Sequence, residues 1–116
     1  MNTYLKGRLA EREVEKLLQI NGFVQTYKAP HVRFSKCHDL WNAWDIISIR
    51  DDLVRCYFQV KTNPSHYYTA KKKLMAWVKM FGIPTEEYIL LLYQGKRKVR
   101  KFDCATGREV PVNFVN

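Results

Sequence analysis

Residues 44–61 read WDIISIRDDLVRCYFQVK, with β-branched and aromatic residues on both sides of Asp51-Asp52. Such runs around a short polar turn predict a β-hairpin, with arms at 44–50 and 53–61. The acid at Asp45 stands between apolar neighbours, where a carboxylate is costly to bury without a partner or a metal ion. The hairpin is therefore expected to carry both the centre of a sheet and a candidate site.

Two helices are expected outside this hairpin. Apolar residues on one helical face predict the first from Thr3 to about Ile20, and Asn21-Gly22 ends it. A similar pattern predicts the second from about Thr69 to Phe81, ended by Gly82 and Pro84.

Further strands are expected at 23–28, 88–93 and 96–102, and Thr106-Gly107 is expected to turn the chain into a last short one. The run at 88–93 is continuously apolar, as in a strand buried on both faces. A long polar and aromatic loop is expected at 29–43. The prediction is one α/β domain over residues 1–116, a mixed sheet flanked by helices in the order α-β-β-β-α-β-β.

The charge balance points toward polyanions. The chain has 20 Lys and Arg against 11 Asp and Glu, a net charge of +9. Residues 59–116 carry 11 of these cations and only 4 of the acids. Such a field attracts nucleic acid and makes its binding sensitive to salt, although the same charge also serves solubility.

The cysteines and the hydropathy restrict the setting. Cys37, Cys56 and Cys104 have no paired spacing, which argues against a zinc ribbon or a disulfide framework and favours reduced thiols. No apolar run approaches the roughly 20 residues that span a bilayer, and residues 1–9 lack an apolar signal core. We expect a protein without membrane association, in the cytoplasm of a prokaryotic or a virus-infected host cell.

Asp45, Gln59 and Lys61 are the candidate site. Hydrolysis of a phosphodiester uses a hard divalent ion held by oxygen ligands, with a lysine to stabilise charge. Gln59 and Lys61 are two apart on one strand and share a face. A two-residue hairpin loop would pair Asp45 with Phe58, and a three-residue loop would pair it with Gln59. The functional interpretation therefore predicts an odd loop or a bulge, while an ordinary strand-end lysine remains the alternative for Lys61.

The D-x(13)-Q-x-K spacing of these three residues resembles the PD-(D/E)xK nuclease superfamily. The K-G-x-x-x-E-R sequence at 6–12, Gly22-Phe23 and Asp45-Ile46-Ile47 follow in the order seen in archaeal-type Holliday junction resolvases. The resemblance covers about residues 5–82. It implies a restriction-endonuclease-like fold, a homodimer, and Mg²⁺- or Mn²⁺-dependent cleavage of branched DNA such as four-way junctions. Exposed apolar residues near 75–81 would serve the dimer.

The resemblance also implies site residues. Glu11, Asp45 and Gln59 would be metal ligands, Lys61 the catalytic lysine, and Ser35 an assisting residue on the long loop. Helical periodicity alone does not choose between Glu11 and Glu13. Two departures stand out: Gln59 replaces the usual glutamate, which removes one charge from the metal site, and Trp44 replaces a proline before Asp45.

Basic clusters mark where DNA would lie. They are found near the start of the first helix, on the second helix and in the basic strand, and the candidates are Lys6, Arg8, Lys71, Lys72, Lys73, Lys79, Lys96 and Arg97. The alternative is a solvated helix face and a charged edge strand. Three functions stay open: a junction resolvase, a PD-(D/E)xK nuclease of restriction, homing or repair type, and a catalytically weakened DNA-binding module.

Overall fold

The computed structural model describes residues 3–28, 43–95 and 98–112, which form one six-stranded sheet with two helices. The elements are α1 (Thr3–Ile20), β1 (Phe23–Lys28), β2 (Ile46–Arg50), β3 (Arg55–Lys61), α2 (Pro64–Phe81), β4 (Glu87–Tyr93), β5 (Val99–Asp103) and β6 (Arg108–Val110). The expected α/β class, with a mixed sheet flanked by helices, is confirmed. The order differs from the predicted one by β6, which follows the turn at Thr106-Gly107.

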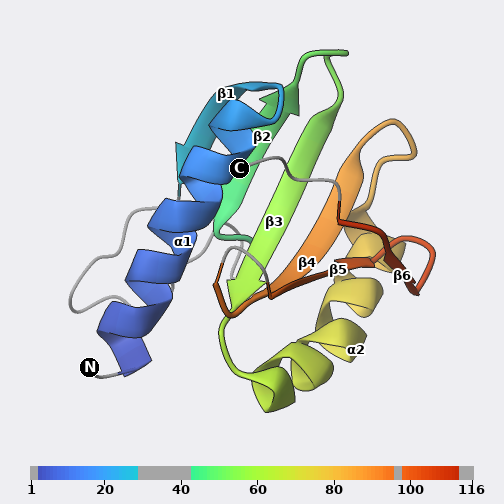
Figure 1. Cartoon of the computed structure of the whole chain (residues 1–116). Coiled ribbons are helices and arrows are strands. Elements are labelled where there is room, and N and C mark those ends of the chain that lie inside the picture. The colour runs from blue at the N-terminus through green and yellow to red at the C-terminus, as the bar shows by residue number, and fades with distance from the viewer. Residues whose placement is uncertain (1–2, 29–42, 96–97, 113–116) are drawn as a thin grey trace, which may run out of the picture.

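The strands lie in the sheet in their order along the chain, from β1 to β6. All neighbours are antiparallel except β3 and β4, which are parallel and are joined by α2. Figure 1 shows α1 on one face of the sheet and α2 on the other. The sheet therefore has a hydrophobic core on each face, one under each helix.

Side chains of β3 alternate between the two cores. Cys56, Phe58 and Val60 pack in the core under α1, whereas Tyr57 packs in the core under α2. Because successive strand residues point to opposite faces, Gln59 and Lys61 lie on the α2 face. Strand β4 is buried from Tyr88 to Tyr93 and contributes to both cores, as its apolar run predicts.

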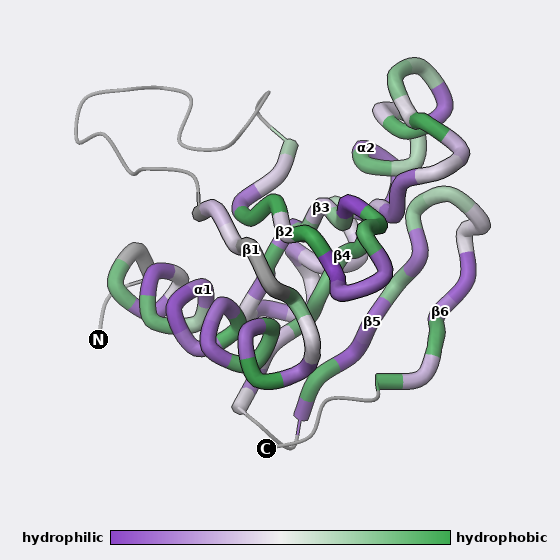
Figure 2. Tube along the Cα trace, turned by 90° about the horizontal axis from the view of Figure 1, so that it is seen from above, coloured by the Kyte–Doolittle hydropathy of each residue, from purple (hydrophilic) through white to green (hydrophobic). Residues whose placement is uncertain are grey.

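Helix α1 is amphipathic, as expected. It turns Ala10, Val14, Leu17 and Leu18 into the core, and hydrophilic and hydrophobic residues alternate along its tube in Figure 2. None of the helices in the described part of the chain is long and apolar enough to cross a bilayer.

Helix α2 begins at Pro64, earlier than the predicted Thr69. The side-chain oxygen of Asn63 accepts a hydrogen bond of 2.8 Å from the Ser65 amide and caps the helix. Proline at the first helical position lacks only an N–H that would have no helical partner. The Asn63-Pro64 pair is thus the helix start, and the predicted start at about Thr69 was wrong.

The β2–β3 hairpin has a loop with an odd number of residues, as the candidate site requires. Ile49 pairs with Arg55, and the Arg50 amide donates to the Val54 carbonyl at 2.9 Å. Asp51, Asp52 and Leu53 remain as a three-residue loop, and Leu53 has a φ of 68°. A left-handed residue at the third loop position is the usual geometry of such hairpins.

Candidate active site

Asp45 and Gln59 are brought together at the end of the sheet where β2 begins. The regular β2–β3 ladder ends with Ile46 opposite Phe58, and one residue further the Asp45 amide donates to the Phe58 carbonyl at 2.8 Å. Register therefore slips by one residue at Asp45, as at a β-bulge. The Asp45 carboxylate reaches β3 from this position.

The Asp45 carboxylate is held by two donors from β3. Its Oδ2 accepts from Gln59 Nε2 at 3.0 Å and from the Val60 amide at 2.8 Å. Asp45 is 3% exposed and Gln59 is 5% exposed. Hydrogen bonds to a buried carboxylate offset much of its desolvation cost, which explains how an acid is tolerated here.

The Gln59 amide faces Asp45 with its nitrogen. A metal ion would need its carbonyl oxygen instead, because hard cations bind oxygen. A half-turn of the amide exchanges the two atoms. Ligation by Gln59 and the hydrogen bond to Asp45 are therefore alternative states of one side chain.

Glu11 and Glu13 differ in their exposure to solvent. Glu11 is 6% exposed, whereas Glu13 lies exposed on the same helix. Glu11 nevertheless belongs to α1, across the sheet from the face that carries Gln59 and Lys61. Any site shared by Glu11, Asp45 and Gln59 must therefore form at the end of the sheet and not on one of its faces.

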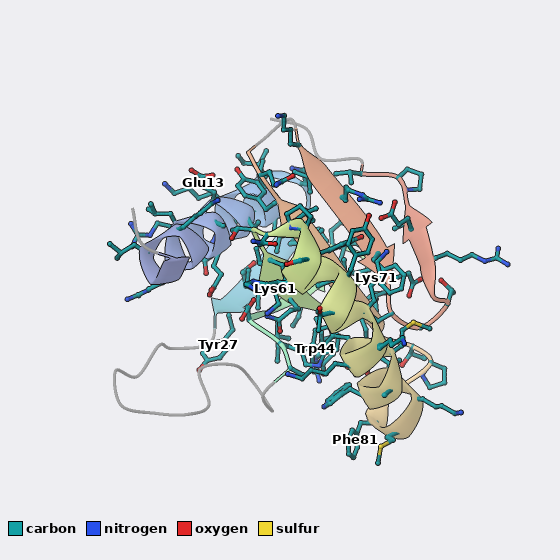
Figure 3. The ribbon with its side chains drawn as sticks, turned by 90° about the horizontal axis from the view of Figure 1, so that it is seen from below. Glu13, Tyr27, Trp44, Lys61, Lys71 and Phe81 are labelled. Atoms are coloured by element: carbon teal, nitrogen blue, oxygen red, sulfur yellow. The ribbon has the colours of Figure 1, made fainter. Side chains whose placement is uncertain are left out.

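Two clefts flank the C-terminal end of β3. The first, of about 220 Å³, lies against α2 and is lined by Gln59, Lys61, His66, Thr69 and Lys73 among others. The second, of about 230 Å³, lies against α1 and is lined by Lys6, Glu13, Thr62 and Tyr93 among others. In Figure 3, Lys61 lies between the two helices, consistent with this placement.

His66 and Thr69 join the candidate site through α2, although the sequence argument gave them no role in it. With Lys73 they follow a spacing of three and four residues, which places them on one stripe of a helix. Recognising Asn63-Pro64 as the helix start would have revealed this stripe. His66 is exposed.

Metal ligands are few in this region. Within residues 3–28, 43–95 and 98–112, no three His, Cys, Asp or Glu side chains gather into a group that could hold an ion. The predicted set contains two carboxylates, Glu11 and Asp45, and the Gln59 amide. An ion bound there would have to complete its coordination with water or phosphate oxygens, as Mg²⁺ commonly does.

The predicted DNA-contacting cations divide into distinct groups. Lys73 and Lys6 each line one of the clefts beside β3. Lys72 and Lys79 are exposed, and helical spacing places them on the outer side of α2. Arg8 is half-buried.

Lys71 is occupied within the protein. Its Nζ lies 4.6–4.8 Å from the ring centres of Tyr67, Tyr68 and Phe102 and 3.8 Å from Glu109 Oε1. Cation–π contacts and the ion pair hold the ammonium against the protein surface. We therefore assign Lys71 a structural role beside any contact with DNA.

Three predicted residues lie outside the described part of the chain. They are Ser35 on the 29–43 segment, and Lys96 and Arg97 before β5.

Comparisons with known proteins found no matching family model, no matching curated protein and no matching solved structure. Motif spacing and the geometry of the site therefore carry the functional argument.

Proposed function

We propose that this protein is a metal-dependent endonuclease that hydrolyses phosphodiester bonds in branched DNA, with the four-way junction as its first candidate substrate. The observation that carries the proposal is the buried Asp45–Gln59 pair beside the Lys61 cleft, in a chain of net charge +9. A buried acid bonded to Gln59, which lines a cleft with Lys61 and Lys73, suits metal-assisted chemistry on a phosphate.

Each residue has a distinct role in this proposal. Glu11, Asp45 and the carbonyl oxygen of Gln59 would hold Mg²⁺ or Mn²⁺, which supplies Lewis acidity and an activated water. Lys61 stabilises negative charge on the attacked phosphate from the α2 side of β3. Lys73 and Lys6, in the two flanking clefts, hold neighbouring phosphates on either side of the strand end.

A homodimer is part of the proposal, because symmetric cuts in a junction need two sites. Met75 and Met80 are 39% and 74% exposed on α2. Exposed apolar side chains on one helix are suited to contact a second copy.

The test is cleavage of a labelled four-way junction beside a linear duplex, a flap and a single strand. Reactions contain Mg²⁺, Mn²⁺ or chelator, and the variants are Lys61→Ala and the exposed control Lys98→Ala. Paired nicks in the junction, lost with Lys61→Ala and with chelator but kept with Lys98→Ala, would support the resolvase. Cutting of the other substrates would instead indicate a restriction, homing or repair type of nuclease.

A DNA-binding module without catalysis is the second candidate. It is favoured by one observation: two N–H donors already satisfy Asp45 Oδ2 without any ion. Titration with Mn²⁺ separates the two. A nuclease site should bind Mn²⁺ and lose it in Asp45→Asn, whereas the binding module should bind junction DNA without any response to the metal.

A further inference from the structure

An aromatic cleft of about 640 Å³ lies at the C-terminal end of α2. It is lined by Tyr57, Trp77, Phe81, Ile83, Glu86 and Tyr88. The rings form a connected set: Tyr57 stacks on Tyr88 with centres 4.9 Å apart, and Trp77 lies 5.7 Å from Tyr88 and 5.3 Å from Phe81. Phe81 is 58% exposed, so the set is open to solvent on one side.

This cleft lies next to the cleft of Gln59 and Lys61, along the contact between β3 and α2. Tyr57, Gln59 and Lys61 share one face of β3, and positions four apart on a strand are about 13 Å apart. Along α2, Lys73 in the first cleft and Trp77 and Phe81 in the second lie on successive turns of one stripe. Both clefts therefore lie between the same strand and the same helix flank.

Trp44 packs behind the aromatic cleft, in the interior of the protein. It is fully buried, packs against Trp77 and Tyr88 with ring centres 5.4 and 5.6 Å away, and is followed by Asp45. Figure 3 shows Trp44 between Lys61 and Phe81. The residue that bonds Gln59 is thus one peptide away from the aromatic set.

Glu86 is the acidic residue of the cleft, and it holds the rings of Tyr57 and Tyr88 in place. Glu86 Oε1 accepts from the hydroxyls of Tyr57 and Tyr88 at 3.2 and 3.1 Å, and its Oε2 lies 3.4 Å from Arg55 Nη1. Arg55 offsets the negative charge of Glu86 beside the cleft. What remains for a ligand is mainly aromatic surface with little net charge.

We propose that this cleft binds an unpaired nucleobase of the DNA strand whose phosphate occupies the Lys61 cleft. The inference rests on the proposed DNA substrate and specifies how it is recognised. A base is flat and stacks on aromatic side chains whatever its sequence. Its backbone carries the negative charge that a +9 protein attracts, which an apolar peptide does not.

Such a pocket selects for DNA that has unpaired bases to offer. Paired bases within a duplex are stacked on their neighbours, and extracting one costs energy. Branch points, frayed ends and overhangs supply bases at lower cost. The cleft therefore favours branched or frayed DNA over intact duplex without reading sequence.

The test is binding in the presence of chelator, which removes cleavage from the measurement. The full chain is titrated by fluorescence anisotropy into three duplexes: one with a three-thymidine overhang, one with a three-residue abasic overhang of the same charge, and one with blunt ends. We expect the thymidine overhang to bind about tenfold more tightly than the abasic one, from stacking of one base. Phe81→Ala should remove most of this difference and leave abasic and blunt binding unchanged.

Leu53→Ala is the control, since it removes an exposed apolar side chain that lies outside both the cleft and the proposed dimer contact. It should keep the preference for bases. Equal binding of thymidine and abasic overhangs by the unaltered protein would overturn the proposal. The proposal would also be overturned if Phe81→Ala dissociated a dimer and weakened binding of all three DNAs equally, because the cleft would then belong to an interface between copies. Base-dependent binding without metal-dependent cleavage would overturn the proposed nuclease activity but support the base-binding cleft.

Discussion

The amide nitrogen of Gln59 lies 3.0 Å from Oδ2 of Asp45, and both side chains are almost completely buried. A glutamate at position 59 would place a second carboxylate against Asp45, and two buried like charges need a cation between them. The amide replaces that requirement with a hydrogen bond. The protein can therefore fold around this pair whether or not a metal ion is bound.

Gln59→Glu should make the pair dependent on pH and metal. Without metal at pH 8, we expect the free energy of unfolding to fall by about 1–3 kcal/mol, because a buried charge loses its donor and gains a repulsion. The new carboxyl should have a raised pKa, so its neutral form restores stability at low pH and stability is lost as pH rises. Mn²⁺ should also restore it. Thermal unfolding from pH 5 to 8, with Mn²⁺ or chelator, measures both effects.

Gln94→Glu is the control for this experiment, since it adds the same charge at an exposed position. It should change neither the pH profile nor the response to Mn²⁺. Equal stability of Gln59→Glu and the unaltered protein at every pH would contradict the assigned hydrogen bond.

Lys73 and Lys79 should differ in their contribution to DNA binding. Lys73 lines the cleft of Lys61, whereas Lys79 lines a different cleft beside Cys104. Lys73→Ala should weaken binding and reduce the slope of log K against log salt by about 1, as expected for one lost phosphate contact. Lys79→Ala should leave the slope unchanged. Anisotropy titrations at several salt concentrations measure these slopes. Equal slopes in the two variants would refute the placement of DNA along β3 and α2.

Lys71 should matter for stability. Lys71→Ala removes an ammonium held over three rings, and we expect a loss of about 1 kcal/mol in the free energy of unfolding. Lys72→Ala removes the exposed neighbouring lysine and should be neutral. Urea unfolding of both variants tests this. A neutral Lys71→Ala would mean that the cluster with Tyr67, Tyr68 and Phe102 contributes nothing to stability.

The hairpin loop stores strain at Leu53. Its φ of 68° is unfavourable for a residue with a Cβ, and its side chain is 82% exposed. Leu53→Gly should raise the free energy of unfolding by about 1 kcal/mol. Leu53→Ala loses the same exposed side chain but keeps the Cβ, so it should give no comparable gain. Chemical denaturation of the pair isolates the backbone effect, and equal gains would assign the effect to the side chain.

The buried thiols should be inert. Burial raises the pKa of both Cys56 and Cys104 to about 12, and thiolates are the reactive form. In a Cys37→Ser variant at pH 8, a thiol reagent should label neither cysteine until denaturant is added. The same shift means that stability from these two groups is complete below the ordinary thiol pKa of 9.0 and is lost as pH rises toward 12. Rapid labelling without denaturant would contradict their burial.

Local patterns were sufficient to predict most of the secondary structure. Apolar spacing identified α1 and α2, and the continuous apolar run identified β4, because these signals depend on residues close together in the chain. The start of α2 was missed because Asn63-Pro64 serves equally as a turn and as a helix cap. The turn at Thr106-Gly107 predicted a last short strand, but the predicted order omitted it, because a three-residue strand has little pattern of its own.

What the sequence determined by itself is which residues are chemically suited to a site: an acid among apolar residues at Asp45, a lysine two residues after Gln59, and a strongly basic second half. Only the tertiary structure decided which of them meet. The three-residue loop sets the β2–β3 register, and the Asp45 carboxylate, just beyond the paired residues, accepts from the Gln59 side chain. Packing of α1 buried Glu11 and left Glu13 exposed, and packing of α2 held Lys71 on aromatic rings and placed Lys73 in the cleft. These outcomes depend on hydrogen bonds and burial between segments far apart in the chain, which a local pattern of residues does not contain.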